Sequence, residues 1–83
     1  MQIQVEAYVD QGGTEQLRRF RLDGRVIEVA DNIDHWDGTN YRYVKIRDRD
    51  GNIYILRHNE TTAEWDLTMY ERAQSRGSLT SVD

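Results

Sequence analysis

Four side chains that are typical ligands of divalent cations stand close together: Asp31, Asp34, His35 and Asp37. Carboxylate oxygens and an imidazole nitrogen would form a metal site if one bend of the chain held them all around one point. The alternative is a solvated strand bend whose charges point outward. No Glu or His follows at a spacing diagnostic of a metal motif, so we expect the bend and no metal cofactor.

The stretch Asp48–Asn52, Asp-Arg-Asp-Gly-Asn, resembles part of a calcium-binding loop. An EF-hand loop needs a third acidic ligand before its glycine and a Glu at its twelfth position, which here is Asn59. The pair Asp50-Gly51 is instead typical of a tight turn between two strands, because glycine accepts a positive φ without strain. We therefore interpret this stretch as a hairpin turn.

Nothing in the sequence predicts catalysis. The two histidines, His35 and His58, lie on different segments, and no Ser or Thr stands in a nucleophile motif. The chain has no cysteine, which excludes disulfides, thiolate metal sites and a cysteine nucleophile. Acids are plentiful, but none lies in an apolar setting that would raise its pKa. We expect a protein that is not an enzyme and has no cofactor.

The strongest functional pattern is an interleaving of basic and aromatic side chains. Its basic members come from neighbouring predicted hairpins, with Arg19 and Arg21 on the first, and Tyr41 and Tyr43 share a strand face with Lys45 and Arg47. The candidate binding residues are Tyr41, Arg42, Tyr43, Lys45, Arg47 and Arg57. A sheet face of Tyr and Arg can stack bases and hold phosphates. The alternative is structural, because cross-strand Tyr–Arg and Arg–acid pairs also stabilise sheet surfaces.

The length and the net charge of the chain limit its number of domains, the size of its core and the partners that it implies. A chain of 83 residues forms one small domain with a modest core, so dimerisation or a host protein would add stability. The net charge is −4; residues 17–58 carry nine Lys or Arg against seven acids, and both flanking segments are acidic. Such a mixed surface does not by itself imply nucleic acid.

The location follows from what the sequence lacks. The first residues have neither the basic nor the apolar region of a secretory signal, and no apolar run approaches the roughly 20 residues that cross a bilayer. We expect a cytoplasmic protein with no membrane association.

The elements that would position these residues are β-strands, and the central one is a hairpin over Tyr41–His58. Val44 and Ile46 alternate with polar residues, which is the period of a half-buried strand. After the turn, Tyr54 and Leu56 share one face while Ile53 and Ile55 share the other. Apolar residues on both faces predict a strand inside the sheet rather than at its edge.

The remaining elements also show strand patterns. Apolar residues alternate over 1–9, and a second hairpin turns at Asp23-Gly24. We expect a loop over residues 10–17, and a bulge or strand bend after Val29, where the alternation is lost. The last strand covers 64–70.

These patterns predict an all-β protein: one antiparallel meander of about six strands, either a curled sheet or a small barrel. Residues 1–70 would form this single domain. The polar segment 71–83 has almost nothing to bury, and we expect a disordered, mobile tail beyond about Ser75. Four aromatic residues at inward strand positions are assigned to the core: Phe20, Trp36, Tyr54 and Trp65. The alternative is that a Trp left partly exposed is an anchor for a protein partner.

A family resemblance covers about residues 18–70. It is carried by Phe20-Arg21-Leu22-Asp23-Gly24-Arg25 with Ile27 and Val29, then Ile33-Asp34-x-Trp36, Tyr43-x-Lys45-Ile46, Asp50-Gly51, Tyr54-x-Leu56, Trp65-x-Leu67 and Tyr70. The chain resembles small uncharacterised bacterial β domains that occur alone, or as a C-terminal segment of inactive relatives of translesion DNA polymerases. It departs from them in an extra strand over 1–9 and a short connection at 37–40. The resemblance implies an all-β fold and brings no catalytic residues.

The sequence favours a non-enzymatic interaction module that docks on a protein partner or self-associates. The reason is that the strand is apolar on both faces: Ile53 and Ile55 form a second apolar face, and so small a chain has few residues left to bury it. The alternative is a single-stranded nucleic-acid-binding module accessory to DNA metabolism. Salt separates the two, because phosphate contacts weaken steeply as salt rises and apolar contacts do not.

Overall fold

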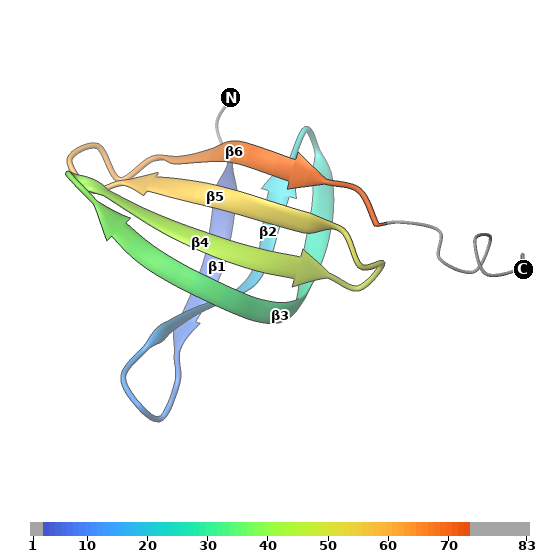
Figure 1. Cartoon of the computed structure of the whole chain (residues 1–83), viewed down its shortest axis with the longest axis horizontal. Helices are drawn as coiled ribbons and strands as arrows, with labels where there is room; N and C mark the ends of the chain where they lie inside the picture. Colours follow the sequence, from blue (N-terminus) through green and yellow to red (C-terminus); the bar gives the residue numbers. More distant parts are fainter. Residues whose placement is uncertain (1–2, 74–83) are drawn as a thin grey trace, which may run out of the picture.

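The structure is a computed structural model that describes residues 3–73. These residues form one antiparallel sheet in which each strand pairs with the next along the chain (Figure 1). The strands are β1 (Gln4–Val9), β2 (Glu15–Leu22), β3 (Arg25–Gly38), β4 (Tyr41–Asp48), β5 (Ile53–Asn59) and β6 (Trp65–Glu71). The predicted all-β meander of six strands is confirmed. Of the tail expected over 71–83, Glu71 belongs to β6, and residues 74–83 lie outside the described residues.

The long strand β3 divides the sheet into two layers. Its first part pairs with β2 as far as Glu28, and its second part pairs with β4 from Val29 onward. Just after this point the register with β4 shifts twice, between Val29 and Asp31 and between Asn32 and Asp34, as the lost alternation after Val29 predicts. Bulges bend a strand, so β3 curves around and brings the β1–β2 pair against β4–β6 (Figure 1). The core lies between these layers.

Both layers contribute to one hydrophobic core. Its buried side chains are Ile3, Leu17, Phe20, Ile27, Val44, Ile46, Tyr54 and Leu56. The predicted inward faces of β4 and β5 are thereby confirmed, and β5 lies between β4 and β6 as its two apolar faces indicate. Phe20 packs edge-on against Tyr54 with ring centroids 5.1 Å apart, and Trp65 is half-buried against this core.

The sheet is curled but not closed into a barrel. Only one isolated bridge joins its two edges within the described residues: the Ile3 N–H donates to the Trp65 carbonyl at 3.2 Å. Strands β1 and β6 meet at this corner and diverge beyond it (Figure 1). Of the two predicted architectures, the curled sheet is therefore the one that the chain adopts.

The prediction of a loop over residues 10–17 is wrong at its C-terminal end. Strand β2 begins at Glu15, and Leu17 is only 2% exposed. The reason is a bulge: Glu6 pairs with Arg19 and Ala7 with Leu17, so Arg18 is an extra residue in β2. The bulge places Leu17 and Phe20, three residues apart, on the same inward face. Inward residues of a regular strand stand two apart, so the alternation pattern does not reveal this strand.

Asn32 stabilises the place where β2 and β3 separate. Its side-chain oxygen accepts a hydrogen bond from the Leu17 N–H at 2.9 Å, and its amide donates to the Leu17 carbonyl at 3.1 Å. The paired ladder of β2 and β3 ends at Arg19 and Glu28. The Asn32 amide thus replaces the missing strand neighbour of a buried residue.

The turn between β4 and β5 is organised by Asp48, which is 7% exposed. Its carboxylate accepts hydrogen bonds from the Asp50 N–H, from the N–H and side-chain amide of Asn52, and from the Tyr54 hydroxyl, each at 2.9 Å. Gly51 has φ +91°, a conformation that favours glycine. The stretch that resembles a calcium loop is therefore a hairpin turn, as predicted, and the Asp48 carboxylate that organises it is a finding of the structure.

Candidate binding surface

The residues singled out from the sequence lie mostly on one side of the sheet. On β4, Val44 and Ile46 point into the core, so Tyr41, Tyr43, Lys45 and Arg47 lie on the opposite side. Arg57 on β5 pairs directly with Tyr43 and shares that side. We call the side of β3–β6 turned away from the core the outer face. It brings together five of the six predicted residues.

Trp36 is the outer-face residue that the sequence interpretation missed. It was assigned to the core, and that assignment is wrong: Trp36 is 40% exposed. It pairs with Tyr43 across β3 and β4, and the two rings stack in parallel with centroids 5.5 Å apart and an angle of 6°. Alternation counted from the inward Val29 already puts Trp36 on the opposite face, because the two register shifts of β3 each reverse the faces and therefore cancel before Trp36.

The aromatic group continues along β4. The Tyr41 ring lies 6.4 Å from the Tyr43 ring, and the Arg57 guanidinium lies over Tyr41 at 4.5 Å from its centroid. Arg57 also donates to the Asp66 carboxylate at 3.3 Å, and this hydrogen bond raises the pKa of Arg57. Trp36, Tyr43, Tyr41 and Arg57 thus form a continuous row in which Trp36 and Tyr43 are stacked and the Tyr41 ring is tilted by 47° from Tyr43; we call it the aromatic row.

Carboxylates compensate the cations of the outer face. Arg47 forms an ion pair with Asp31 at 3.2 Å, and Arg57 pairs with Asp66. Lys45 stands directly across from Asp34 in the sheet register. Each basic residue of the predicted group on this face thus has an acidic neighbour, which the sequence alone did not reveal because the acids lie on β3 and β6. The face carries little net positive charge for a phosphate backbone.

Next to the aromatic row, the outer face is apolar. Ile53 and Ile55 on β5 are half-buried, and Met69 on β6 pairs with Ile55. The predicted two-faced character of β5 is confirmed, because Tyr54 and Leu56 fill the core on the other side. No further layer of described residues covers these side chains, so the outer face of β5 and β6 has apolar groups available for contact.

Arg42 lies apart from the other predicted residues. Its strand position places it on the same side as Val44, where it forms an ion pair with Glu15 of β2. It lines a hollow of about 250 Å³ together with His35 and Asp37. Arg42 therefore belongs to the contact between the two layers rather than to the outer face.

The four possible metal ligands do not converge. Asp31 and Asp34 lie across from Arg47 and Lys45 on the outer face, whereas His35 and Asp37 line the hollow beside Arg42. In the part of the chain that the structure describes, no group of three or more acidic or histidine side chains could hold a metal ion. The segment is a strand bend with its charges on both sides.

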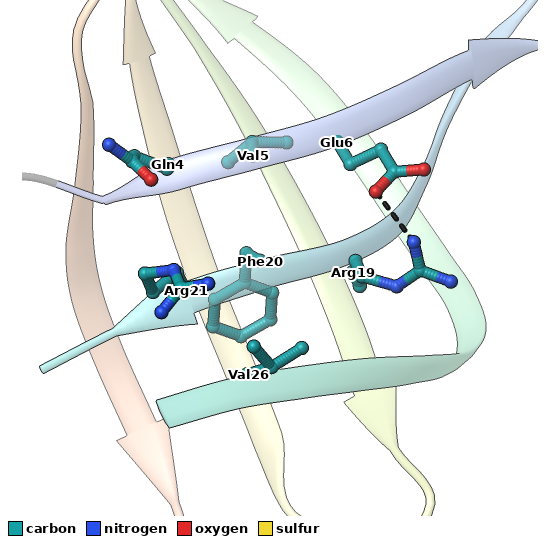
Figure 2. Close-up of a pocket in the computed structure, with 7 residues that line it drawn as sticks. All are labelled: Gln4, Val5, Glu6, Arg19, Phe20, Arg21 and Val26. Atoms are coloured by element: carbon teal, nitrogen blue, oxygen red, sulfur yellow. Dashed lines mark hydrogen bonds and ion pairs between the residues drawn. The ribbon is translucent and has the colours of Figure 1, made fainter. Parts of the chain in front are cut away.

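A second hollow lies on the far side of the β1–β3 layer. It has a volume of about 210 Å³, and Figure 2 shows Arg19 reaching Glu6 beside Gln4 and Arg21. Arg19 is bound to Glu6 at 2.6 Å and to Glu28 at 3.2 Å, and these acids raise its pKa. Of the two arginines that line this hollow, Arg19 is therefore compensated by acids, as the cations of the outer face are.

Comparison with known proteins gives no identification. No family model, no curated protein and no solved structure matches this chain. The family resemblance seen in residues 18–70 therefore stays a prediction. Among residues 3–73 no helix is long and apolar enough to cross a membrane.

Proposed function

We propose that this protein is a non-enzymatic interaction module that docks on a partner protein through its outer face. The observation that supports this most is the exposed Trp36, held in a parallel stack on Tyr43. Trp and Tyr are enriched among the residues that dominate the energy of protein–protein interfaces. A ring that is already fixed against its neighbour loses little conformational entropy when a partner covers it.

The surroundings of the aromatic row support a protein partner. Ile53, Ile55 and Met69 lie next to it with apolar surface exposed, and charged pairs such as Arg47–Asp31 lie at its margin. An apolar and aromatic centre with a polar rim is the usual composition of a protein interface. The partner would present apolar side chains to the aromatic row, with polar groups around them.

Single-stranded nucleic acid is the second candidate. The contact of Arg57 with Tyr41, and the ring stack beyond it, resemble the platforms on which bases stack. The compensated charges argue against it, because such proteins use unpaired cations to hold phosphates. A titration with a mixed-sequence oligonucleotide separates the candidates: binding that weakens steeply between low and physiological salt would favour nucleic acid.

The protein-docking proposal is tested by quantitative affinity capture at physiological salt with three forms of the full chain. Wild type and Val26→Ala should retain the same partner, and Trp36→Ala should lose most of it. Val26 is a matched control because it is a large exposed apolar residue, 50% exposed, on the same strand as Trp36 but away from the outer face. A partner retained equally by all three forms would contradict the proposal.

A further inference from the structure

Among the residues that the structure describes, strand β1 has one edge without a neighbouring strand. It pairs with β2 on one side, and within residues 3–73 its other side meets only the bridge from Ile3 to Trp65. The Ile3 N–H points away from β2, and the Asp10 N–H points toward the β1–β2 turn, where it donates to Thr14. Because backbone groups alternate along a strand, the N–H and C=O groups of Val5, Ala7 and Val9 point outward from the free edge.

This edge has few of the features that usually protect a sheet from pairing with another chain. Such protection comes from proline, inward-pointing charge or a bulge in the edge strand. The bulge here is in β2, and the only charged residue of β1, Glu6, is held by Arg19 at 2.6 Å. Val9 is 67% exposed and Tyr8 is 40% exposed at the end of the strand. The edge is suited to adding a strand.

We propose that β1 pairs antiparallel with β1 of a second copy, forming a two-fold symmetric dimer centred on Ala7. A two-fold axis makes both copies use the same surface, so the strand must be complementary to itself. In this arrangement Val5 pairs with the partner's Val9, and Ala7 pairs with the partner's Ala7. The outward backbone groups of each pair then exchange hydrogen bonds across the axis.

The register follows from two features of β1. A dimer centred on Val5 would place the partner's Ala7 against Ile3, whose N–H already bonds Trp65. A dimer centred on Glu6 would set two glutamates directly opposite one another, which is destabilising. The register centred on Ala7 avoids both conflicts and uses every outward group from Val5 to Val9.

Side chains on both faces also match in this register. On the core side, Val5 meets the partner's Val9, so the exposed Val9 gains an apolar neighbour. On the other side, Glu6 stands opposite the partner's Tyr8. Arg18 already lies over the Tyr8 ring at 4.8 Å and within 3.9 Å of Glu6, so a cation is in place beside the new pair. The match is apolar on one face and charge-compensated on the other.

Sedimentation velocity over a concentration series tests the dimer directly. Wild type should move from monomer to dimer as concentration rises. Ala7→Pro removes an N–H that only the partner uses, and Val9→Lys places a charge at the apolar pair; each should weaken dimerisation by at least about tenfold in Kd. Val26→Lys is the matched control, since Val26 is also exposed on the β1–β3 layer but is not on the edge strand, and it should dimerise as wild type does.

Amide hydrogen exchange identifies the surface used. The amides of Val5, Ala7 and Val9 should exchange rapidly in the monomer and become protected as the dimer forms. If Ala7→Pro fails to fold, Val9→Lys and this exchange experiment decide the question. A wild-type chain that stays monomeric at about 1 mM, or a dimer in which these three amides exchange as fast as in the monomer, would overturn the proposal. Trp36→Ala should leave dimerisation unchanged, so this test is independent of the outer face.

Discussion

Asp48 is the buried carboxylate among the described residues, and it shows how a charge is kept inside a small core. Burial acts to raise the pKa of Asp48, but hydrogen bonds from Asn52, Tyr54 and the Asp50 N–H outweigh it and hold the pKa below the ordinary value of 3.8. Burial, together with the hydrogen bond to this carboxylate, raises the pKa of the Tyr54 hydroxyl far above its ordinary value. The pair stays in one protonation state, charged acid and neutral phenol, across the physiological range.

This arrangement predicts a pH dependence of stability. Because the folded-state pKa of Asp48 is lowered, its stabilisation is complete above the unfolded value near 3.8 and is lost as pH falls through the lower folded value. Asp48→Asn should lower the free energy of unfolding by about 2–3 kcal/mol at pH 7 and remove part of the loss below pH 4. Urea denaturation at pH 7, 4 and 3 measures both effects. Asp50→Asn, exposed in the same turn, should keep the wild-type pH profile; an Asp48→Asn profile parallel to wild type would contradict this account.

At the residue scale, the sequence predicted which side chains share the outer face better than it predicted the acidic partners of those side chains. Tyr41, Tyr43, Lys45 and Arg47 share a face because they alternate along one regular strand. Trp36 joins them because it pairs with Tyr43; the two register shifts of β3 cancel before this position, so its face is the one that alternation from Val29 gives. The carboxylate partners Asp31 and Asp66 depend on cross-strand register, which a single sequence does not fix for distant strands.

At the element scale, the hairpins and the irregularity of β3 after Val29 were predictable, whereas the start of β2 was not. The turns at Asp23-Gly24 and Asp50-Gly51 stand where the sequence placed them, with both glycines at positive φ. The start of β2 was missed because Arg18 interrupts the alternation. The Asn32 contact with Leu17 could not be anticipated either, since it joins residues that are neighbours only after β3 has bent.

That contact gives a prediction about the joint between the two layers. Asn32→Ala would leave the N–H and C=O of the buried Leu17 without their partners and should lower the free energy of unfolding by about 1–2 kcal/mol. Asn32→Asp should cost less, because a carboxylate still accepts from the Leu17 N–H although it cannot donate to the carbonyl. Chemical denaturation compares the three forms. Equal stability of Asn32→Ala and wild type would mean that water replaces the side chain without loss.

At the scale of the whole molecule, the two layers are held together at the corner where β1 crosses β6. Ile3 is 3% exposed, lies in the common core and forms the bridge to Trp65. Although it stands near the start of the described chain, it is a core residue with partners in both layers. Ile3 therefore contributes to the fold as a residue of an internal core strand does.

Truncating this side chain therefore has a larger effect than its position suggests. Ile3→Ala should lower the free energy of unfolding by about 2–4 kcal/mol, because it opens a cavity between the layers. Val5→Ala, which is half-buried on the same face of β1, is the control and should cost clearly less. Thermal or urea unfolding of both variants measures the difference. An Ile3→Ala variant no less stable than Val5→Ala would show that the corner contributes little to the fold.

The central claim is that the outer face binds a protein through Trp36 and the stacked Tyr43. Its most direct test is the affinity of the captured partner for Trp36→Ala and for Val26→Ala, measured by calorimetry at physiological salt. We predict that Trp36→Ala loses at least 2 kcal/mol of binding free energy, about thirtyfold in Kd, as removal of a dominant interface residue does. Val26→Ala should bind as wild type does. Equal affinities for the two variants would contradict the account and place the binding site elsewhere on the molecule.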